Sequence, residues 1–123
     1  MAKPHVLVVD DDKPSRDITR MFLRDLCDVD TADSGESAIK KVQGKKYDAI
    51  LMDIGLGREM NGLEATRIIR KNADYVDVPI IAVTAYSMQG DKEEFLEAGC
   101  SHYLAKPFEK ETIKELIKKA LSI

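Results

Sequence analysis

The sequence is poor in the residues that bind metals through sulfur or nitrogen. Two of its 123 residues are cysteine and two are histidine, with no Cys-x-x-Cys pair and no cluster of the two types. This favours two reduced thiols, Cys27 and Cys100, in a cytoplasmic protein over a disulfide or a zinc site. His5 and His102 are isolated, and neither lies in the helical context of a phosphodonor histidine, so both are interpreted as structural or surface residues.

Long apolar runs and an excess of positive charge are also absent. No segment approaches the roughly 18 apolar residues of a membrane span, and the first five residues do not resemble a signal peptide. The net charge is −3, so nothing indicates a nucleic-acid or acidic-membrane partner. The chain does have 44% hydrophobic residues over a length close to that of a common domain, which predicts one domain over residues 1–123.

Apolar runs and helical spacings alternate five times along the chain. Strands are predicted at 5–9, 27–32, 48–53, 78–84 and 101–105, and helices from Pro14 to about residue 26, then at 34–44, 61–72, 88–98 and around 113–121. This alternation predicts an α/β fold with a parallel sheet covered on both faces. A flavodoxin-like (βα)5 doubly wound sheet with strand order 2-1-3-4-5 fits best, because it leaves the charged second strand at an edge.

The apolar residues of each helix predict the side that faces the sheet. The expected inner residues are Ile18, Met21, Phe22 and Leu26 in the first helix, Ala38, Ile39 and Val42 in the second, Leu63, Ile68 and Ile69 in the third, Phe95 and Leu96 in the fourth, and Ile113, Leu116, Ile117, Ala120 and Leu121 in the fifth. Two polar residues are expected to cap helices, Asp12 before the first helix and Ser34 before the second.

Polar side chains stand where the apolar strands end. Asp10 and Asp11 follow the first strand, Asp53 ends the third, Thr84 ends the fourth and Lys106 comes just after the fifth. In this topology these ends point into one cleft. Each residue has an ordinary alternative, as a helix cap, a strand-end hydroxyl or a surface charge. Together the crowded carboxylates favour a hard divalent cation such as Mg²⁺, which relieves their repulsion.

A lysine, a hydroxyl, backbone amides and Mg²⁺ form an environment suited to a phosphoryl group. Asp53 is the carboxylate that faces this environment, and it can act as a nucleophile. These residues stand in five short motifs, which are Val8-Val9-Asp10-Asp11, Leu51-Met52-Asp53, Gly62-Leu63-Glu64, Val83-Thr84-Ala85 and Tyr103-Leu104-Ala105-Lys106-Pro107-Phe108. The five motifs, in this order and on these elements, resemble the CheY-like receiver domain of two-component response regulators.

The resemblance implies that Asp53 accepts a phosphoryl group from a phosphohistidine on a sensor histidine kinase or a histidine phosphotransfer protein. It implies that Asp11, Asp53 and the carbonyl of Gly55 bind Mg²⁺, with Asp10 assisting through water. Lys106 and Thr84 are then expected to contact the phosphoryl oxygens, and Thr84 and Tyr103 to form a switch pair. Such a protein is a signalling phosphoprotein that catalyses its own phosphoryl transfer and slow dephosphorylation, and not an enzyme in the usual sense.

The family resemblance extends to partners and to one peptide bond. The surface of the fourth helix, fifth strand and fifth helix is expected to bind a downstream protein, in a monomer or a weak phosphorylation-dependent dimer. The Lys106–Pro107 bond is expected to be cis from the family, whereas the sequence alone favours trans. The start at Met1 mildly favours a natural N-terminus, in a complete regulator or in a receiver that is part of a longer protein.

Two features depart from the family pattern. Leu56-Gly57 stands where the family commonly has Met-Pro, and the loop from Asp53 to Gly62 is one residue longer than usual, so a looser loop is expected. Tyr86 is predicted to slow the entry of the hydrolytic water. Three other classes of protein fit the sequence less well. An aspartate-nucleophile phosphatase lacks its motif here, a flavodoxin needs a phosphate-binding loop in place of the acids, and a pseudo-receiver would lack one of the key residues.

Overall fold

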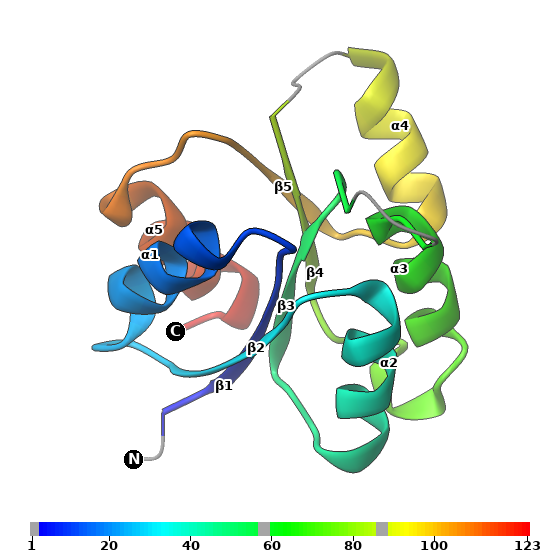
Figure 1. Ribbon diagram of the computed structural model, residues 1–123, viewed down its shortest axis with the longest axis horizontal. Coiled ribbons are helices and arrows are strands. Elements are labelled where there is room, and N and C mark those ends of the chain that lie inside the picture. The colour runs from blue at the N-terminus through cyan, green and yellow to red at the C-terminus, as the bar shows by residue number, and fades with distance from the viewer. Residues whose placement is uncertain (1–2, 57–59, 86–88) are drawn as a thin grey trace.

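The computed structural model describes residues 3–56, 60–85 and 89–123 (Figure 1). Its centre is a five-stranded parallel sheet in the order β2-β1-β3-β4-β5, so the predicted flavodoxin-like topology is confirmed. The strands are β1 (His5–Val9), β2 (Asp28–Ala32), β3 (Ala49–Asp53), β4 (Ile80–Thr84) and β5 (His102–Ala105). The charged strand β2 lies at an edge, as expected.

Helices cover both faces of this sheet. They are α1 (Lys13–Leu23), α2 (Gly35–Gly44), α3 (Gly62–Arg70), α4 (Gln89–Ala98) and α5 (Lys110–Leu121), with a short 3-10 helix η1 (Ala73–Tyr75) that the sequence did not predict. In Figure 1, α1 and α5 lie on one face, and α2, α3 and α4 lie on the other. Across the described residues, no helix has the length and apolar character needed to cross a membrane.

Two apolar layers hold the sheet between the helices. Successive side chains of a strand point to opposite faces, so each central strand contributes to both layers. The layer under α2, α3 and α4 includes Leu7, Ile50, Met52, Ile80, Ile69 and Phe95, and the layer under α1 and α5 includes Val6, Val8, Leu51, Ile81, Ile113 and Ile117. All five residues of β3 are buried, and its last residue is Asp53. Burial on both faces therefore delivers this carboxylate to the carboxyl edge of the sheet.

Helix α1 forms where it was predicted, and two of the four expected inner residues, Phe22 and Leu26, are partly buried, but the other two are wrong. Ile18 and Met21 are 47% and 51% exposed, while Thr19 and Leu23 are buried. The helix also ends at Leu23 and not near residue 26, because the amides of Leu26 and Cys27 both turn back to the carbonyl of Leu23. A helix of this length buries one narrow stripe, so a shift of one position exposes half of the expected residues.

The predictions for α3 and α4 are each wrong at one residue, since Ile68 and Leu96 are exposed whereas Leu63, Ile69 and Phe95 are buried. In α3 a polar residue takes an inner position, because the buried hydroxyl of Thr66 donates a hydrogen bond to the carbonyl of Gly62 at 2.8 Å. The predicted inner residues of α2 and α5 are confirmed as buried or partly buried. Ser34 caps α2 by accepting from the amide of Ser37.

A network of hydrogen bonds joins η1 to the residues just before β3, at the amino end of the sheet. The buried Tyr75 hydroxyl accepts from the amide of Tyr47 and donates to the carbonyl of Lys45, both at 2.9 Å. The hydroxyl of Tyr47 in turn donates to Asp30 at 2.7 Å. These bonds anchor the start of β3, the strand that leads to Asp53.

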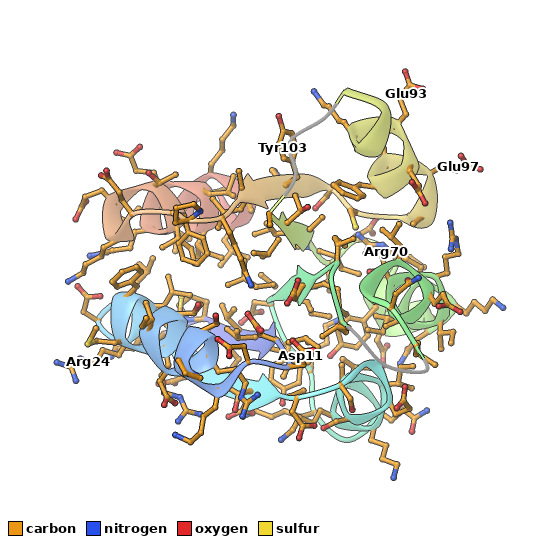
Figure 2. All side chains as sticks on the ribbon, turned by 45° about the horizontal axis from the view of Figure 1, so that its top comes forward. Asp11, Arg24, Arg70, Glu93, Glu97 and Tyr103 are labelled. Atoms are coloured by element: carbon orange, nitrogen blue, oxygen red, sulfur yellow. The ribbon has the colours of Figure 1, made fainter. Side chains whose placement is uncertain are left out.

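Arg70, at the end of α3, ties three backbone segments together. Its guanidinium donates to the carbonyls of Gly99, Tyr75 and Val78 at 2.8, 2.6 and 2.6 Å. Gly99 follows α4 with a φ of 113°, a conformation that favours glycine. In Figure 2 Arg70 lies between α3 and α4, where it holds the two helices to the same side of the sheet.

Candidate functional site

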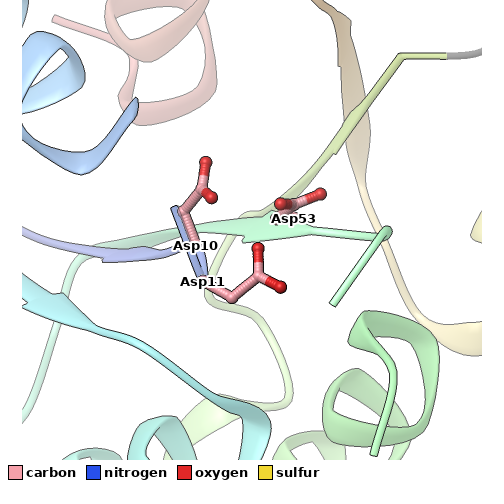
Figure 3. Close-up of side chains that lie close together, drawn as sticks. All are labelled: Asp10, Asp11 and Asp53. Carbon is pink, nitrogen blue, oxygen red and sulfur yellow. The ribbon is translucent and has the colours of Figure 1, made fainter. Parts of the chain in front are cut away.

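Three carboxylates meet at the carboxyl edge of the sheet. Strands β1 and β3 are neighbours, and Val9 lies level with Met52. Asp10, just after β1, and Asp53, the last residue of β3, therefore emerge side by side. Asp10, Asp11 and Asp53 each offer one oxygen, and these oxygens all lie within 4.8 Å of one another (Figure 3). Asp10 and Asp53 are buried, and Asp11 is exposed. The cluster is therefore open to solvent on the side of Asp11.

Lys106 brings a positive charge to this cluster from the far side of the sheet. Its Nζ lies 2.9 Å from Oδ2 of Asp10 and 3.5 Å from Oδ2 of Asp53. Strand β4 holds the lysine in place, because the amide of Lys106 donates to the carbonyl of Thr84 at 2.8 Å. The Lys106–Pro107 bond is cis, as the family resemblance implies and against the preference read from the sequence alone.

Among the residues that the structure describes, the ammonium group of Lys106 contacts two of the three carboxylates, those of Asp10 and Asp53. Burial raises the pKa of Asp53, and the nearby Asp10 adds to this, while the Gly55 amide, 2.9 Å from Oδ1, and the charge of Lys106 oppose it. Burial lowers the pKa of Lys106, but its hydrogen bond to Asp10 and the charge of Asp53 outweigh that effect and leave it raised. A further cation with a preference for oxygen ligands fits this donor set.

Thr84 and Tyr103 occupy two different environments near the cleft. Thr84 is buried at the end of β4, level with Ala105 of β5. Tyr103 lies on β5 with 43% of its surface exposed, and the Nζ of Lys92 in α4 is 5.8 Å from the centre of its ring. Figure 2 shows Tyr103 at the outer surface of the molecule, away from Asp11. The structure therefore has the tyrosine turned outward.

Comparison with known proteins accounts for this arrangement. The model of the response regulator receiver domain family matches residues 6–118. The chain belongs to this family. One curated relative of this receiver domain is the signal transduction histidine-protein kinase BarA of Escherichia coli, which is 38% identical over 113 residues. The match covers 91% of this chain but only 12% of BarA, so the chain spans a small part of that relative.

Solved structures give the same assignment for the fold. The chemotaxis protein CheY4 of Vibrio cholerae has a TM-score of 0.93 and 30% identity, over 98% of this chain and 100% of that one. The receiver domain of the sensor histidine kinase PA1611 of Pseudomonas aeruginosa has a TM-score of 0.90 and 36% identity, over 99% and 100%. That structure has a magnesium ion coordinated in its active site cleft.

Asp12 and Arg16 add two contacts to the receiver cleft. Asp12 caps α1, as predicted, by accepting from Ser15, and its amide donates to Oδ1 of Asp10 at 2.9 Å. Arg16 donates to the carbonyl of Asp10 at 2.8 Å, a contact that sequence reasoning missed. The sequence signal for this contact was the position of Arg16, one turn into a helix that starts beside the site. Both contacts hold Asp10 in its buried position in the cleft.

An apolar groove of about 560 Å³ opens beside Lys106, and its lining includes Ile18 and Phe22 of α1 together with Pro107 and Phe108. The exposed Ile18 thus faces a groove that borders the receiver cleft. Leu56 is buried in the loop after Asp53. The expectations of a looser loop and of slower water entry concern Gly57 and Tyr86. Both residues lie outside the described part of the chain.

Proposed function

We propose that this receiver domain accepts a phosphoryl group on Asp53 from a phosphohistidine of a sensor histidine kinase or a histidine phosphotransfer protein. The observation that carries the proposal is the convergence of Asp10, Asp11, Asp53 and Lys106 at one edge of the sheet. In the transfer, a carboxylate oxygen of Asp53 forms a bond to phosphorus while the bond from phosphorus to the histidine nitrogen breaks.

The residues around Asp53 fit a divalent cation, because three carboxylate oxygens lie within 4.8 Å of one another and one of the acids is open to solvent. Asp11 and Asp53, with the carbonyl of Gly55, would hold Mg²⁺, and Asp10 would assist through water. Bound Mg²⁺ supplies positive charge that offsets the charge on the phosphoryl oxygens. The relative PA1611, with magnesium in its cleft, supports this assignment.

Lys106 and Thr84 would contact the transferred group. The ammonium of Lys106 already lies 3.5 Å from Asp53, so a short movement brings it to a phosphoryl oxygen bound there. Thr84 ends the neighbouring strand and offers a hydroxyl donor. Positioned charges and donors of this kind do most of the work in phosphoryl transfer.

The new charge would then act as a switch. A phosphoryl group adds about 1.5 to 2 negative charges at Asp53, which draws Thr84 and Lys106 toward it. We infer that Tyr103, which is turned outward in the structure, rotates into the space that Thr84 leaves. The surface formed by α4, β5 and α5 changes shape as a result, and a downstream protein binds the changed surface.

The apolar groove beside Lys106 is the surface that we assign to the phosphodonor protein. It borders the acceptor, and its Ile18 and Phe22 side chains offer apolar area that a donor can cover. The fit of such a surface would hold the phosphohistidine close to Asp53, which is the main requirement for in-line transfer.

Incubation with acetyl phosphate and Mg²⁺, followed by intact-mass measurement, tests the proposal. The wild type is expected to gain one phosphoryl group, and both Asp53→Asn and removal of Mg²⁺ with EDTA are expected to abolish the gain. Asp28→Asn, which removes an exposed carboxylate on β2, is the matched control and should still be phosphorylated. Phosphorylation of Asp53→Asn at the wild-type rate would refute the acceptor assignment, and an unmodified wild type would favour a pseudo-receiver.

A further inference from the structure

The first residue of α3 lies directly against the backbone of the proposed acceptor. A Cβ built on Gly62 would lie far inside van der Waals contact of the Asp53 carbonyl oxygen, 2.9 Å from the Cα of Ile54 and 3.0 Å from the carbonyl carbon of Asp53. All three atoms are backbone atoms, so no change of rotamer can make room for the added carbon. Only a displacement of α3 or of the Asp53–Ile54 peptide would do so.

That peptide is held from its other side as well. The amide of Ile54 donates to the carbonyl of Val83 in the neighbouring strand at 2.9 Å. A peptide unit is planar, so pushing its carbonyl oxygen turns its amide with it. Displacing the Asp53 carbonyl therefore disturbs the bond from Ile54 to Val83. It also moves the next residue, Gly55, whose amide contacts Oδ1 of Asp53 at 2.9 Å.

The first turn of α3 has little freedom to change its shape. Asn61 and Glu64 form a capping box, in which the Asn61 side chain accepts from the Glu64 amide at 2.9 Å and the Glu64 side chain accepts from the Asn61 amide at 3.2 Å. The buried Thr66 hydroxyl donates to the carbonyl of Gly62 at 2.8 Å. These bonds lie within α3 and keep its first turn rigid, so a carbon added at Gly62 must displace the whole helix, with its buried residues, or the Asp53–Ile54 peptide.

We propose that Gly62 is a positioning residue for the cleft. Because it has no side chain, α3 can press against the Asp53–Ile54 peptide and hold it to β4, and this contact sets the direction of the Asp53 carboxylate and of the Gly55 carbonyl. The inference rests on the proposed function, because the Asp53 carboxylate and the Gly55 carbonyl are the oxygen groups assigned there to Mg²⁺.

Gly62→Ala tests the proposal by two measurements that need no phosphorylation. Hydrogen exchange of the Ile54 amide, followed by NMR, should become faster because its bond to Val83 is disturbed. The Kd for Mg²⁺, measured by titration, should rise by about tenfold or more, as is typical when a group that orients a metal ligand is lost. If the wild type itself accepts no phosphoryl group, the proposed function fails, but these two measurements still decide the role of Gly62.

Two controls separate positioning from a general loss of stability. Gly44→Ala adds the same carbon where nothing lies within 4 Å, and Ile117→Val lowers stability in the other apolar layer. Both should leave the Kd and the Ile54 exchange rate relative to neighbouring β3 amides unchanged. A Gly62→Ala protein with the wild-type Kd and a protected Ile54 amide would overturn the proposal.

If Gly62→Ala does not fold, Thr66→Val decides. It removes the hydroxyl that holds the Gly62 carbonyl but adds no atom at the contact. Faster exchange at Ile54, with a smaller rise in the Kd for Mg²⁺, supports the proposal. Wild-type values of both quantities in Thr66→Val refute it.

Discussion

Removing the ammonium group of Lys106 should separate cation binding from phosphoryl transfer. In the structure this ammonium lies 2.9 Å from Asp10 and 3.5 Å from Asp53, so it competes with a cation for the same carboxylates. The side chain of Asp10 is only 6% exposed, and a hydrogen bond between charged groups in such a setting is worth about 1.5 kcal/mol or more. Lys106→Met should therefore bind Mg²⁺ roughly tenfold more tightly, since about 1.4 kcal/mol corresponds to a factor of ten.

The same substitution should slow phosphorylation by about a hundredfold, which is the usual cost of removing one positioned donor to a developing negative charge. Calorimetric titration with Mg²⁺ and the rate of mass gain with acetyl phosphate measure the two effects. Lys114→Met is the matched control, since it removes the same charge from an ion pair with Asp25 on the surface. If Lys106→Met bound Mg²⁺ no more tightly than the wild type, the competition deduced from the structure would be wrong.

Three further predictions concern stability and the switch. Tyr75→Phe removes both hydrogen bonds of a buried hydroxyl and should lower the free energy of unfolding by about 2 kcal/mol in urea denaturation. A loss below about 0.5 kcal/mol would contradict a stabilising role for these two hydrogen bonds. Burial raises the pKa of Cys27 to about 11 from 9.0. The contribution of the neutral thiol to folding stability is therefore complete below pH 9 and is lost as the pH rises toward 11. The stability advantage of the wild type over Cys27→Ala should accordingly shrink over that range, and parallel pH profiles would exclude the effect. Lys92→Gln should raise the inward population of the Tyr103 ring about two- to fivefold, because a cation–π contact is worth about 0.5 to 1 kcal/mol at an exposed site. NMR of labelled tyrosine measures it, with Glu93→Gln as the control, and equal populations in the two variants would count against a role for Lys92.

The parts of this protein that the sequence predicts well depend on local patterns and on general rules of topology. The apolar run before Asp53 predicts a strand buried on both faces, and right-handed crossovers then bring Asp10 and Asp53 to one edge. The meeting of Asp10, Asp53 and Lys106 follows from that topology, although the three residues are far apart in the chain.

The parts that the sequence predicts poorly depend on packing between elements. Ile18 and Met21 have helical spacing but face outward, because the neighbours of α1 determine which stripe is buried. Gly62 is visible as part of a motif, yet its close approach to the Asp53 carbonyl exists only in the folded chain. The contact from Arg16 to Asp10 is of the same kind, since it depends on the angle at which α1 leaves the site.

The ion pair of Lys106 with Asp10 joins residues that are 96 positions apart, and its contact with Asp53 spans 53 positions. A chain in which only the first three strands have assembled contains both acids but lacks their counter-charge. The cleft is therefore complete only in the fully folded domain, and an anionic ligand that needs the ammonium of Lys106 would select that state. A ligand at a hundred times its Kd would stabilise the whole fold by about 2.7 kcal/mol. Binding of such a ligand would thus depend on complete folding, because a partly folded molecule has the acids without the ammonium group.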